Sequence, residues 1–309
     1  MARTSTEEDP DEAWVVALAA AVGGAPEAGV GVGDDAAVLD AAGHVVTTDT
    51  MVEGVHWDDR LSPADVGFKL VAVNVSDVGA MGGRPQWATL AASVPTPMDR
   101  AWLSAFAEGL QAGLRRWGTR LVGGDTTRSP GPRVFSLTVG GLAPRPVLRS
   151  GARPGDHVWV TGALGRSAEA FLAPAPGPEA MAWLRRPLPP VALGAALADA
   201  GLVHAMLDLS DGLARDLGRL CRASGVGARV DPASLPGGRP LVQAVAFGED
   251  YELCFAAPPA ASDAICSLAA MYGVSVSCVG TFTPSPELVL IGHPAWPAPA
   301  FDHFPPGPA

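Results

Sequence analysis

Apolar and polar positions follow two different periods in the first half of the chain. Residues 30–40 and 43–57 read as two strands with apolar alternation, each ending in a polar loop. Ser62 then supplies an N-cap, with proline at the first helical position and aspartate at the third, which predicts a helix over residues 63–80. A second helix is expected over residues 99–117, followed by the strands RLVGG and RVFSLTVGGL. Its apolar face carries Trp102, Phe106, Leu110, Leu114 and Trp117.

The second half begins after a connector rich in proline, glycine and arginine at residues 143–154. HVWVTG is expected to be a strand, and MLDLSDGLARDLGRLC a strand, a tight turn and a helix. ELCFAA and VSVSCVG add strands, the tail at 294–309 is too proline-rich for regular structure, and residues 11–22 predict a short helix. Strands and helices alternate in both halves, so we expect an α/β or α+β fold with two domains, residues 1–145 and 146–309.

Composition and charge narrow the class of protein. The 309 residues are 48% hydrophobic, enough for one or two cores, and the formal net charge is -11. This charge argues against a nucleic-acid partner and against a polybasic membrane patch, since both need clustered Lys and Arg. No apolar run reaches the roughly 18 residues of a membrane span, and the first residues are acidic and polar, unlike a secretory signal. We therefore expect a cytoplasmic protein.

Aspartates beside glycine, serine or threonine recur through the chain, each next to an apolar strand or on a helix. Hard oxygen ligands of this kind suit Mg²⁺, which bridges to phosphates, and glycine lets backbone N–H groups approach phosphate oxygens. One such group alone is ordinarily a turn or a helix cap, but five in one chain favour a metal and phosphate site. They are Gly33-Asp34-Asp35, Thr47-Thr48-Asp49-Thr50, Asn74-Val75-Ser76-Asp77, Gly123-Gly124-Asp125-Thr126-Thr127 and Asp208-Leu209-Ser210-Asp211-Gly212.

Three single residues stand out within or beside these segments. Asp77 shares the apolar face of the 63–80 helix, where an unpaired carboxylate is costly and a metal is the economical partner. Lys69 is the one lysine of the chain, and it could contact phosphate or be a solvated lysine on the helix surface. His56 could contact a ligand or be structural, and the sequence supplies no partner that would make it a general base.

Several common nucleotide-binding signatures are missing. The chain has no G-x-x-x-x-G-K-[ST] loop, no H-R-D or D-F-G segments of a protein kinase, and only part of a G-x-G-x-x-G pattern in VTGALGRSAEA. A P-loop kinase, a protein kinase and a Rossmann dehydrogenase are therefore disfavoured. No activated nucleophile is visible either, so a phosphoenzyme is not expected.

The ordered segments resemble the thiamine-monophosphate kinase family along nearly the whole chain. They are GVGDDAAVL, TTDTMVEGVHW, GFKLVAVNVSDVGAMGG, LVGGDTTRSP, LRSGARPGD, LDLSDGLARDL and GEDYELCF. That family belongs to the superfamily named after aminoimidazole ribonucleotide synthetase. The resemblance implies a two-domain ATP-binding fold whose N-terminal sheet pairs with that of a second subunit in a homodimer. It also implies ATP and several Mg²⁺ ions in the cleft between the domains.

The same resemblance implies an activity and a set of site residues. The activity is direct in-line transfer of the γ-phosphoryl group of ATP to thiamine monophosphate, with no catalytic side chain required beyond a possible role for Lys69. The implied metal ligands are Asp35, Thr47, Thr48, Asp49, Asp77, Asp125, Asp208 and Asp211. The implied ATP contacts are Gly124, Asp125, Arg149 and Ser210. The implied contacts to thiamine monophosphate are His56, Glu249 and Phe301.

Two positions depart from the family pattern, and two other functions stay open. Phe247 replaces a glycine before Gly248-Glu249-Asp250-Tyr251, and Glu108 stands where a tyrosine near the nucleotide is expected. One alternative is another ATP-dependent member of the superfamily. Selenophosphate synthesis needs a reactive residue near the N-terminus, and the first cysteine is Cys221; hydrogenase maturation needs a C-terminal cysteine, and the chain ends PPGPA. The other alternative is a non-catalytic protein that binds ATP and Mg²⁺.

Overall fold

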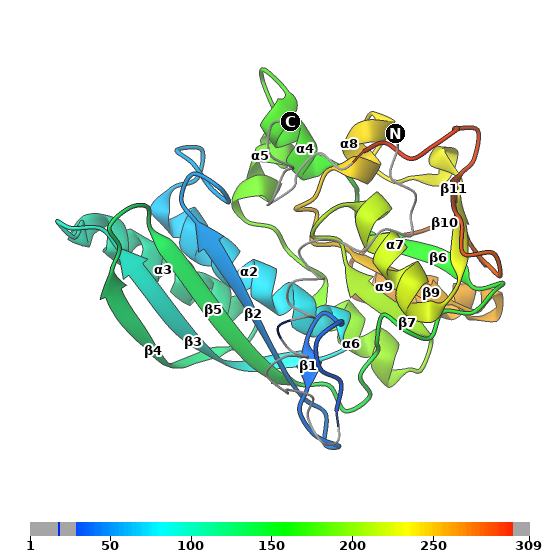
Figure 1. The fold of residues 1–309 in the computed structure, drawn as a ribbon, viewed down its shortest axis with the longest axis horizontal. Coiled ribbons are helices and arrows are strands. Elements are labelled where there is room, and N and C mark those ends of the chain that lie inside the picture. The colour runs from blue at the N-terminus through cyan, green and yellow to red at the C-terminus, as the bar shows by residue number, and fades with distance from the viewer. Residues whose placement is uncertain (1–17, 19–28, 299–309) are drawn as a thin grey trace.

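A computed structural model describes residue 18 and residues 29–298 (Figure 1). The helix expected at residues 11–22, apart from residue 18, and the end of the tail, including Phe301, lie outside the described residues. Two sheets divide the described chain, one formed by the strands up to residue 142 and the other by the strands from residue 157 onward. The α/β class expected from the alternation of elements is confirmed.

The first sheet has five strands in the order β1-β2-β5-β3-β4. All neighbours are antiparallel except β3 and β4, which are parallel and joined by the crossover helix α3. β4 therefore forms one edge, and every residue in it is exposed. The strands are β1 (Ala37–Val38), β2 (His44–Val52), β3 (Arg84–Val94), β4 (Arg120–Arg128) and β5 (Val134–Leu142).

Two helices, α2 (Pro63–Ala80) and α3 (Arg100–Arg116), cover one face of this sheet (Figure 1). The predicted capping box of α2 is present, since Ser62 and Asp65 each accept the backbone N–H of the other. Glycines let the two helices touch: a Cβ on Gly109 would lie 1.7 Å from the carbonyl oxygen of Ala64. This contact sets α2 between α3 and the second half of the molecule.

The second sheet has six strands in the order β11-β8-β10-β6-β9-β7. Its strands are β6 (His157–Thr161), β7 (Ala205–Asp208), β8 (Gly227–Val230), β9 (Leu253–Ala257), β10 (Val276–Thr283) and β11 (Leu288–Leu290). The helices of this half are α4 (Arg166–Leu172), α5 (Pro178–Arg185), α6 (Val191–Asp199), α7 (Leu213–Ser224), α8 (Leu241–Ala246) and α9 (Ser262–Met271). The strand, tight turn and helix expected in MLDLSDGLARDLGRLC are confirmed as β7, residues 209–212 and α7.

The two halves meet along α2. A Cβ on Gly79 would lie 2.9 Å from the Cα of Val191 in α6, so the backbones of the two helices are in close contact. The C-terminal end of α2 thus lies against the second half of the molecule, close to the end of β7 (Figure 1). In the part of the chain that is described, no helix is both long enough and apolar enough to cross a membrane.

Two predictions about local structure need correction. The strand expected at residues 30–40 is only the short β1 with an isolated bridge from Val30 to Val38, because Gly33-Asp34-Asp35 forms a turn instead. The sequence pattern also missed β3, the strand between β5 and β4. Its segment RPQWATLAASV contains proline and several alanines, and its pairing with both neighbours decides its conformation.

Candidate active site

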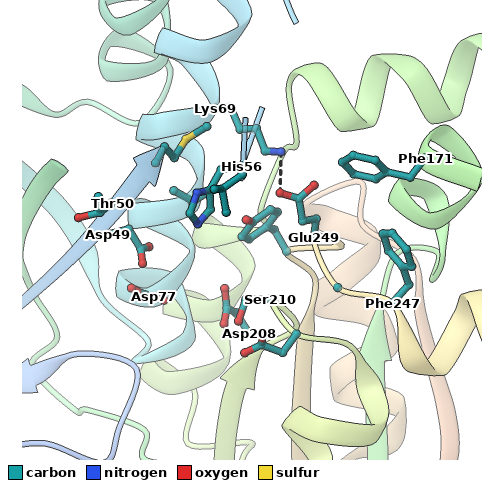
Figure 2. A pocket seen from close by; sticks show the side chains of 16 residues that line it. Asp49, Thr50, His56, Lys69, Asp77, Phe171, Asp208, Ser210, Phe247 and Glu249 are labelled. Carbon is teal, nitrogen blue, oxygen red and sulfur yellow. Dashed lines mark hydrogen bonds and ion pairs between the residues drawn. The ribbon is translucent and has the colours of Figure 1, made fainter. Parts of the chain in front are cut away.

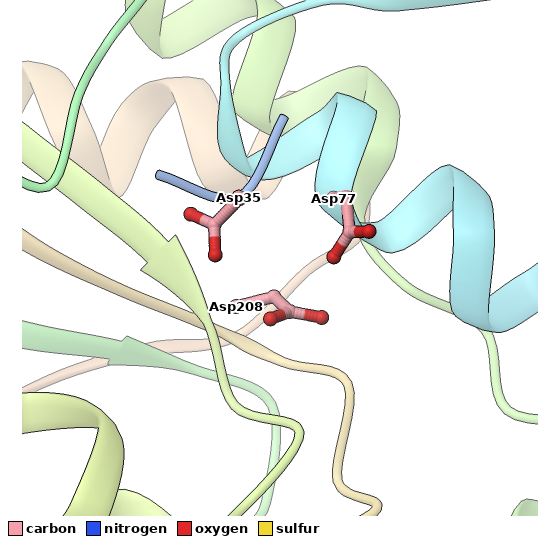
Figure 3. Close-up of side chains that lie close together, drawn as sticks. All are labelled: Asp35, Asp77 and Asp208. Carbon is pink, nitrogen blue, oxygen red and sulfur yellow. The ribbon is translucent and has the colours of Figure 1, made fainter. Parts of the chain in front are cut away.

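Three carboxylates from distant parts of the chain converge where the two halves meet (Figure 3). Asp77 comes from the last turn of α2, Asp208 ends β7, and Asp35 lies in the turn before β1. One carboxylate oxygen from each residue lies within 4.8 Å of those from the other two. We call these residues the aspartate triad.

Short hydrogen bonds hold the triad in place. The Thr47 hydroxyl donates to Asp77 at 2.6 Å, and the Ser76 hydroxyl donates to Asp208 at 2.5 Å. Arg149 donates to Asp35 at 2.8 Å. Thr47 and Arg149, two residues implied by the resemblance, are therefore brought to the triad, with Thr47 on Asp77 and Arg149 on Asp35.

Burial and mutual repulsion disfavour the ionised forms of these carboxyls. Burial, followed by the charges of Asp49, Asp208 and Asp35, raises the pKa of Asp77 well above its ordinary value. Burial and the charge of Asp35 do the same to the pKa of Asp208, and burial raises the pKa of neighbouring Asp49 to about 6. A divalent cation would relieve this repulsion, and a set of carboxylate oxygens is what Mg²⁺ binds. The donor set therefore fits the implied metal.

Two members of the triad, Asp77 and Asp208, line one end of a cavity of about 340 Å³ (Figure 2). Asp49, Asp77 and Asp208 lie at this end, and Glu249 lies farther along the cavity, followed by Phe171 and Phe247. The complete lining is Asp49, Thr50, Met51, Val55, His56, Lys69, Val73, Asp77, Phe171, Asp208, Ser210, Asp211, Phe247, Gly248, Glu249 and Tyr251. The cavity therefore runs from a carboxylate end to an aromatic end.

Lys69 is buried and forms an ion pair across the cavity. Its side chain is 1% exposed, and its Nζ donates to Glu249 Oε1 at 2.7 Å. The alternative of a solvated lysine on the helix surface is therefore wrong. Glu249 and Tyr251 both have positive φ angles, 65° and 48°, so the turn between α8 and β9 is strained. The ion pair joins this turn to α2.

The backbone fixes the orientation of His56. The backbone N–H of Val52 donates to His56 Nδ1 at 3.0 Å, so Nδ1 acts as an acceptor and a neutral ring carries its proton on Nε2. The imidazole lines the cavity. The contact of His56 with a ligand, which the resemblance implies, stays a prediction.

Two loops of the second half complete the cavity wall. Ser210 and Asp211 follow β7, and Asp211 pairs with Arg219 at 2.5 Å. Gly248 packs against this loop so closely that a Cβ would lie 2.2 Å from the Ser210 carbonyl oxygen. Phe247 itself has an extended backbone, with φ −107° and ψ 138°, which any residue adopts. The departure from glycine at residue 247 therefore leaves the loop geometry intact.

Several predicted site residues do not reach the cavity in this chain. Asp125 is exposed on β4, opposite Ala91, and three strand spacings place β4 roughly 14 Å from β2. A Cβ on the neighbouring Gly124 would lie 2.1 Å from the Leu90 carbonyl oxygen, so this glycine permits the pairing of β3 and β4. Thr48 is exposed and donates to the Leu137 carbonyl oxygen. Glu108 is exposed on α3, outside the cavity lining.

Four residues of the site were not singled out from the sequence for the roles that the structure gives them. Phe171 and Phe247 line the aromatic end, and Tyr251 is a further lining residue of the cavity. Asp34 accepts the backbone N–H of Arg149 at 3.1 Å, and burial with the charge of Asp35 raises its pKa to about 7. Asp34 carried a signal, since it stands in one of the acidic segments, whereas the phenylalanines look like ordinary core residues in sequence.

Known proteins match the chain along both halves. The family model described as AIR synthase related protein, N-terminal domain, matches residues 33–143, and the model of the C-terminal domain matches residues 153–293. A curated thiamine-monophosphate kinase of Salmonella typhimurium is 39% identical over 304 residues, covering 89% of this chain and 91% of its own. The enzyme of the same name from Escherichia coli K12 is 38% identical, covering 89% and 92%.

Solved structures agree with this match. The crystal structure of thiamine-monophosphate kinase from Stenotrophomonas maltophilia K279a has a TM-score of 0.75 and 36% identity, covering 86% of this chain and 92% of its own. AaThiL complexed with AMPPCP and TMP has a TM-score of 0.80 and 26% identity, covering 92% and 94%. With matches of this identity and coverage in both halves, the chain belongs to the thiamine-monophosphate kinase family of AIR synthase related proteins.

Proposed function

We propose that the chain is a phosphotransferase that moves the γ-phosphoryl group of ATP to the phosphate of thiamine monophosphate, giving thiamine diphosphate and ADP. The observation that carries this function is the cavity itself, which joins the aspartate triad to a carboxylate and two aromatic rings. A polyphosphate with its cations suits the carboxylate end of the cavity, and a flat cationic ring suits the aromatic end. The relative crystallised with AMPPCP and TMP supports the same pair of substrates.

The chemistry asks little of the side chains beyond position and charge. The acceptor oxygen of a phosphate monoester is already anionic at neutral pH, so no strong general base is needed. Bound Mg²⁺, held by the triad, would supply neutralisation of the phosphate charges. Asp77, Asp208 and Asp35 then fix where these charges lie, while His56 and Glu249 orient the acceptor beside the γ-phosphoryl group.

The cavity lies between the two halves, which the family models match separately at residues 33–143 and 153–293. These matches support two domains, residues 1–145 and 146–309. We also take the enzyme to be a cytoplasmic homodimer. The outer face of the five-stranded sheet supports the dimer, because Thr50 and Ala91 lie exposed there and β4 presents an edge that no other described strand pairs with. Asp125 and Gly124 lie on that edge strand. We continue to predict that Asp125 binds metal and that both residues contact ATP in the assembled dimer.

ADP release tests the function directly. Purified protein with ATP and Mg²⁺ is expected to release ADP only when thiamine monophosphate is added, with thiamine diphosphate formed in equal amount. ADP release that ignores thiamine monophosphate would instead indicate another member of the superfamily. ATP binding with no turnover under any of these conditions would indicate a non-catalytic protein.

A further inference from the structure

Two phenylalanines form the end of the cavity farthest from the aspartate triad. Phe171, in the last turn of α4, and Phe247, directly after α8, lie side by side with ring centroids 5.6 Å apart and an interplanar angle of 36° (Figure 2). Both are partly buried and both line the cavity. We call this pair the aromatic wall.

An arginine side chain packs against one ring of the aromatic wall. The Arg60 guanidinium lies 4.2 Å from the ring centroid of Phe171. Arg60 is itself fixed by a forked pair of hydrogen bonds to Asp58, at 2.9 and 2.7 Å. Because packing and charge fix the Phe171 ring, a ligand meets a preformed surface.

A carboxylate oxygen lies next to the aromatic wall with no partner among the described residues. Glu249 Oε1 accepts from Lys69, whereas Glu249 Oε2 is buried and has no hydrogen-bond partner in the described part of the chain. Leaving such an oxygen unpaired is costly, so it suits a ligand that brings positive charge. A carboxylate beside two aromatic faces matches a flat heteroaromatic cation.

We propose that Phe171 and Phe247 bind the ring system of the acceptor and, with Glu249 as counter-charge, select an acceptor that carries a flat cationic heteroaromatic ring. The proposal rests on the proposed function and adds the residues that determine its acceptor specificity.

Ring-removing and ring-retaining variants test the proposal. Phe171→Leu and Phe247→Leu keep apolar volume but lose the ring, and each is expected to raise the KM for thiamine monophosphate about fivefold. The KM for ATP and the value of kcat should stay within twofold of the unsubstituted enzyme. Phe171→Tyr and Phe247→Tyr retain the ring, so the KM of each variant for thiamine monophosphate should stay close to that of the unsubstituted enzyme.

Direct binding separates the possible failures. Calorimetry with thiamine monophosphate, Mg²⁺ and a non-hydrolysable ATP analogue is expected to show the same fivefold loss in the leucine variants, whose melting temperatures confirm that they fold. An active enzyme whose leucine variants keep the original affinity for thiamine monophosphate would overturn the aromatic wall alone. An unsubstituted protein that neither binds nor phosphorylates thiamine monophosphate would overturn both this inference and the proposed function.

Discussion

Asp77 is surrounded by groups that oppose its ionisation and by one that favours it. Burial and then the charges of Asp49, Asp208 and Asp35 oppose its ionisation, and among the described residues the Thr47 hydroxyl stabilises the carboxylate. A side chain in such surroundings stores free energy that a bound cation releases. The triad is therefore expected to lower the stability of the metal-free protein and to raise its affinity for the metal.

The substitution Asp77→Asn tests this trade. It removes a proposed metal ligand, so turnover at ordinary Mg²⁺ should fall more than about 100-fold. It also removes a repelled charge, so the metal-free variant should melt at a higher temperature than the unsubstituted protein. Asp263→Asn, on the exposed side of α9, is the control and should change neither value. Near-normal turnover of Asp77→Asn would remove Asp77 from the metal site.

Asp250 is buried outside the triad, and it leads to a prediction about how the stability of the protein depends on pH. Burial raises its pKa from 3.8 to about 8, and its Oδ2 accepts the Gly165 backbone N–H at 2.8 Å. The folded state holds this proton more tightly than the unfolded chain, so its contribution to stability declines as pH rises from 3.8 to about 8. Asp250→Asn keeps the acceptor and loses the charge. Its melting temperature should exceed that of the unsubstituted protein at pH 8, and the difference should shrink toward pH 5.

Residue chemistry explains which part of the site the sequence could reveal. Asp35, Asp77 and Asp208 were predictable because a carboxylate beside small residues on an apolar element needs an explanation. Phe171 and Phe247 were not, because a phenylalanine near the end of a helix is ordinarily a core residue. Only the folding of α4 and α8 around the same cavity gives the two rings a different role.

At the scale of elements, the sequence predicted a helix or strand correctly where the residues that determine it are close together in the chain. The bounds of α2 follow from its capping box, which depends on residues 62–65 alone. The sequence did not predict β3, because nothing within Arg84–Val94 specifies a strand. The conformation of this segment comes from its pairing with β4 and β5. The contact of α2 with α3 was equally hidden, since glycine in a helix looks unfavourable until the second helix is seen.

Glycine-to-alanine substitutions test that contact. Gly109→Ala places a Cβ 1.7 Å from the Ala64 carbonyl oxygen, so the helices must separate, at an expected cost of at least about 2 kcal/mol in the free energy of unfolding. Gly218→Ala in α7 is the matched control. Its Cβ meets only the flexible end of Arg222 at 3.4 Å, so it should stabilise by about 0.5–1 kcal/mol. Urea unfolding measures both, and equal effects would exclude the close contact.

At the scale of the whole molecule, β4 forms an edge of the five-stranded sheet that no other described strand covers. Leu121 and Val122 on β4 are 46% and 62% exposed, which is a large exposure for apolar side chains in a strand. A twofold-related copy would cover this edge and the outer sheet face together. The two-domain fold could be predicted from the sequence, but the exposure of this edge depends on strand order, which no local pattern contains.

We therefore expect a homodimer at micromolar concentration. Val122→Asp puts a charge on the edge strand and should shift the mass measured by light scattering toward the monomer. Met271→Asp, at a position 80% exposed on α9 in the other half, is the control and should leave the dimer intact. A monomeric mass for the unsubstituted protein would count directly against the proposed assembly.

The burial of Lys69 has a consequence for chemical labelling. The chain has no other lysine, so its one ε-amine lies 1% exposed and paired with Glu249. Because this amine is buried and paired, we expect an acylating reagent in water to reach it mainly when the turn at residues 248–251 moves away from α2. The acylation rate of Lys69 therefore reports how often that opening occurs. Any molecule that holds the two halves together should lower this rate.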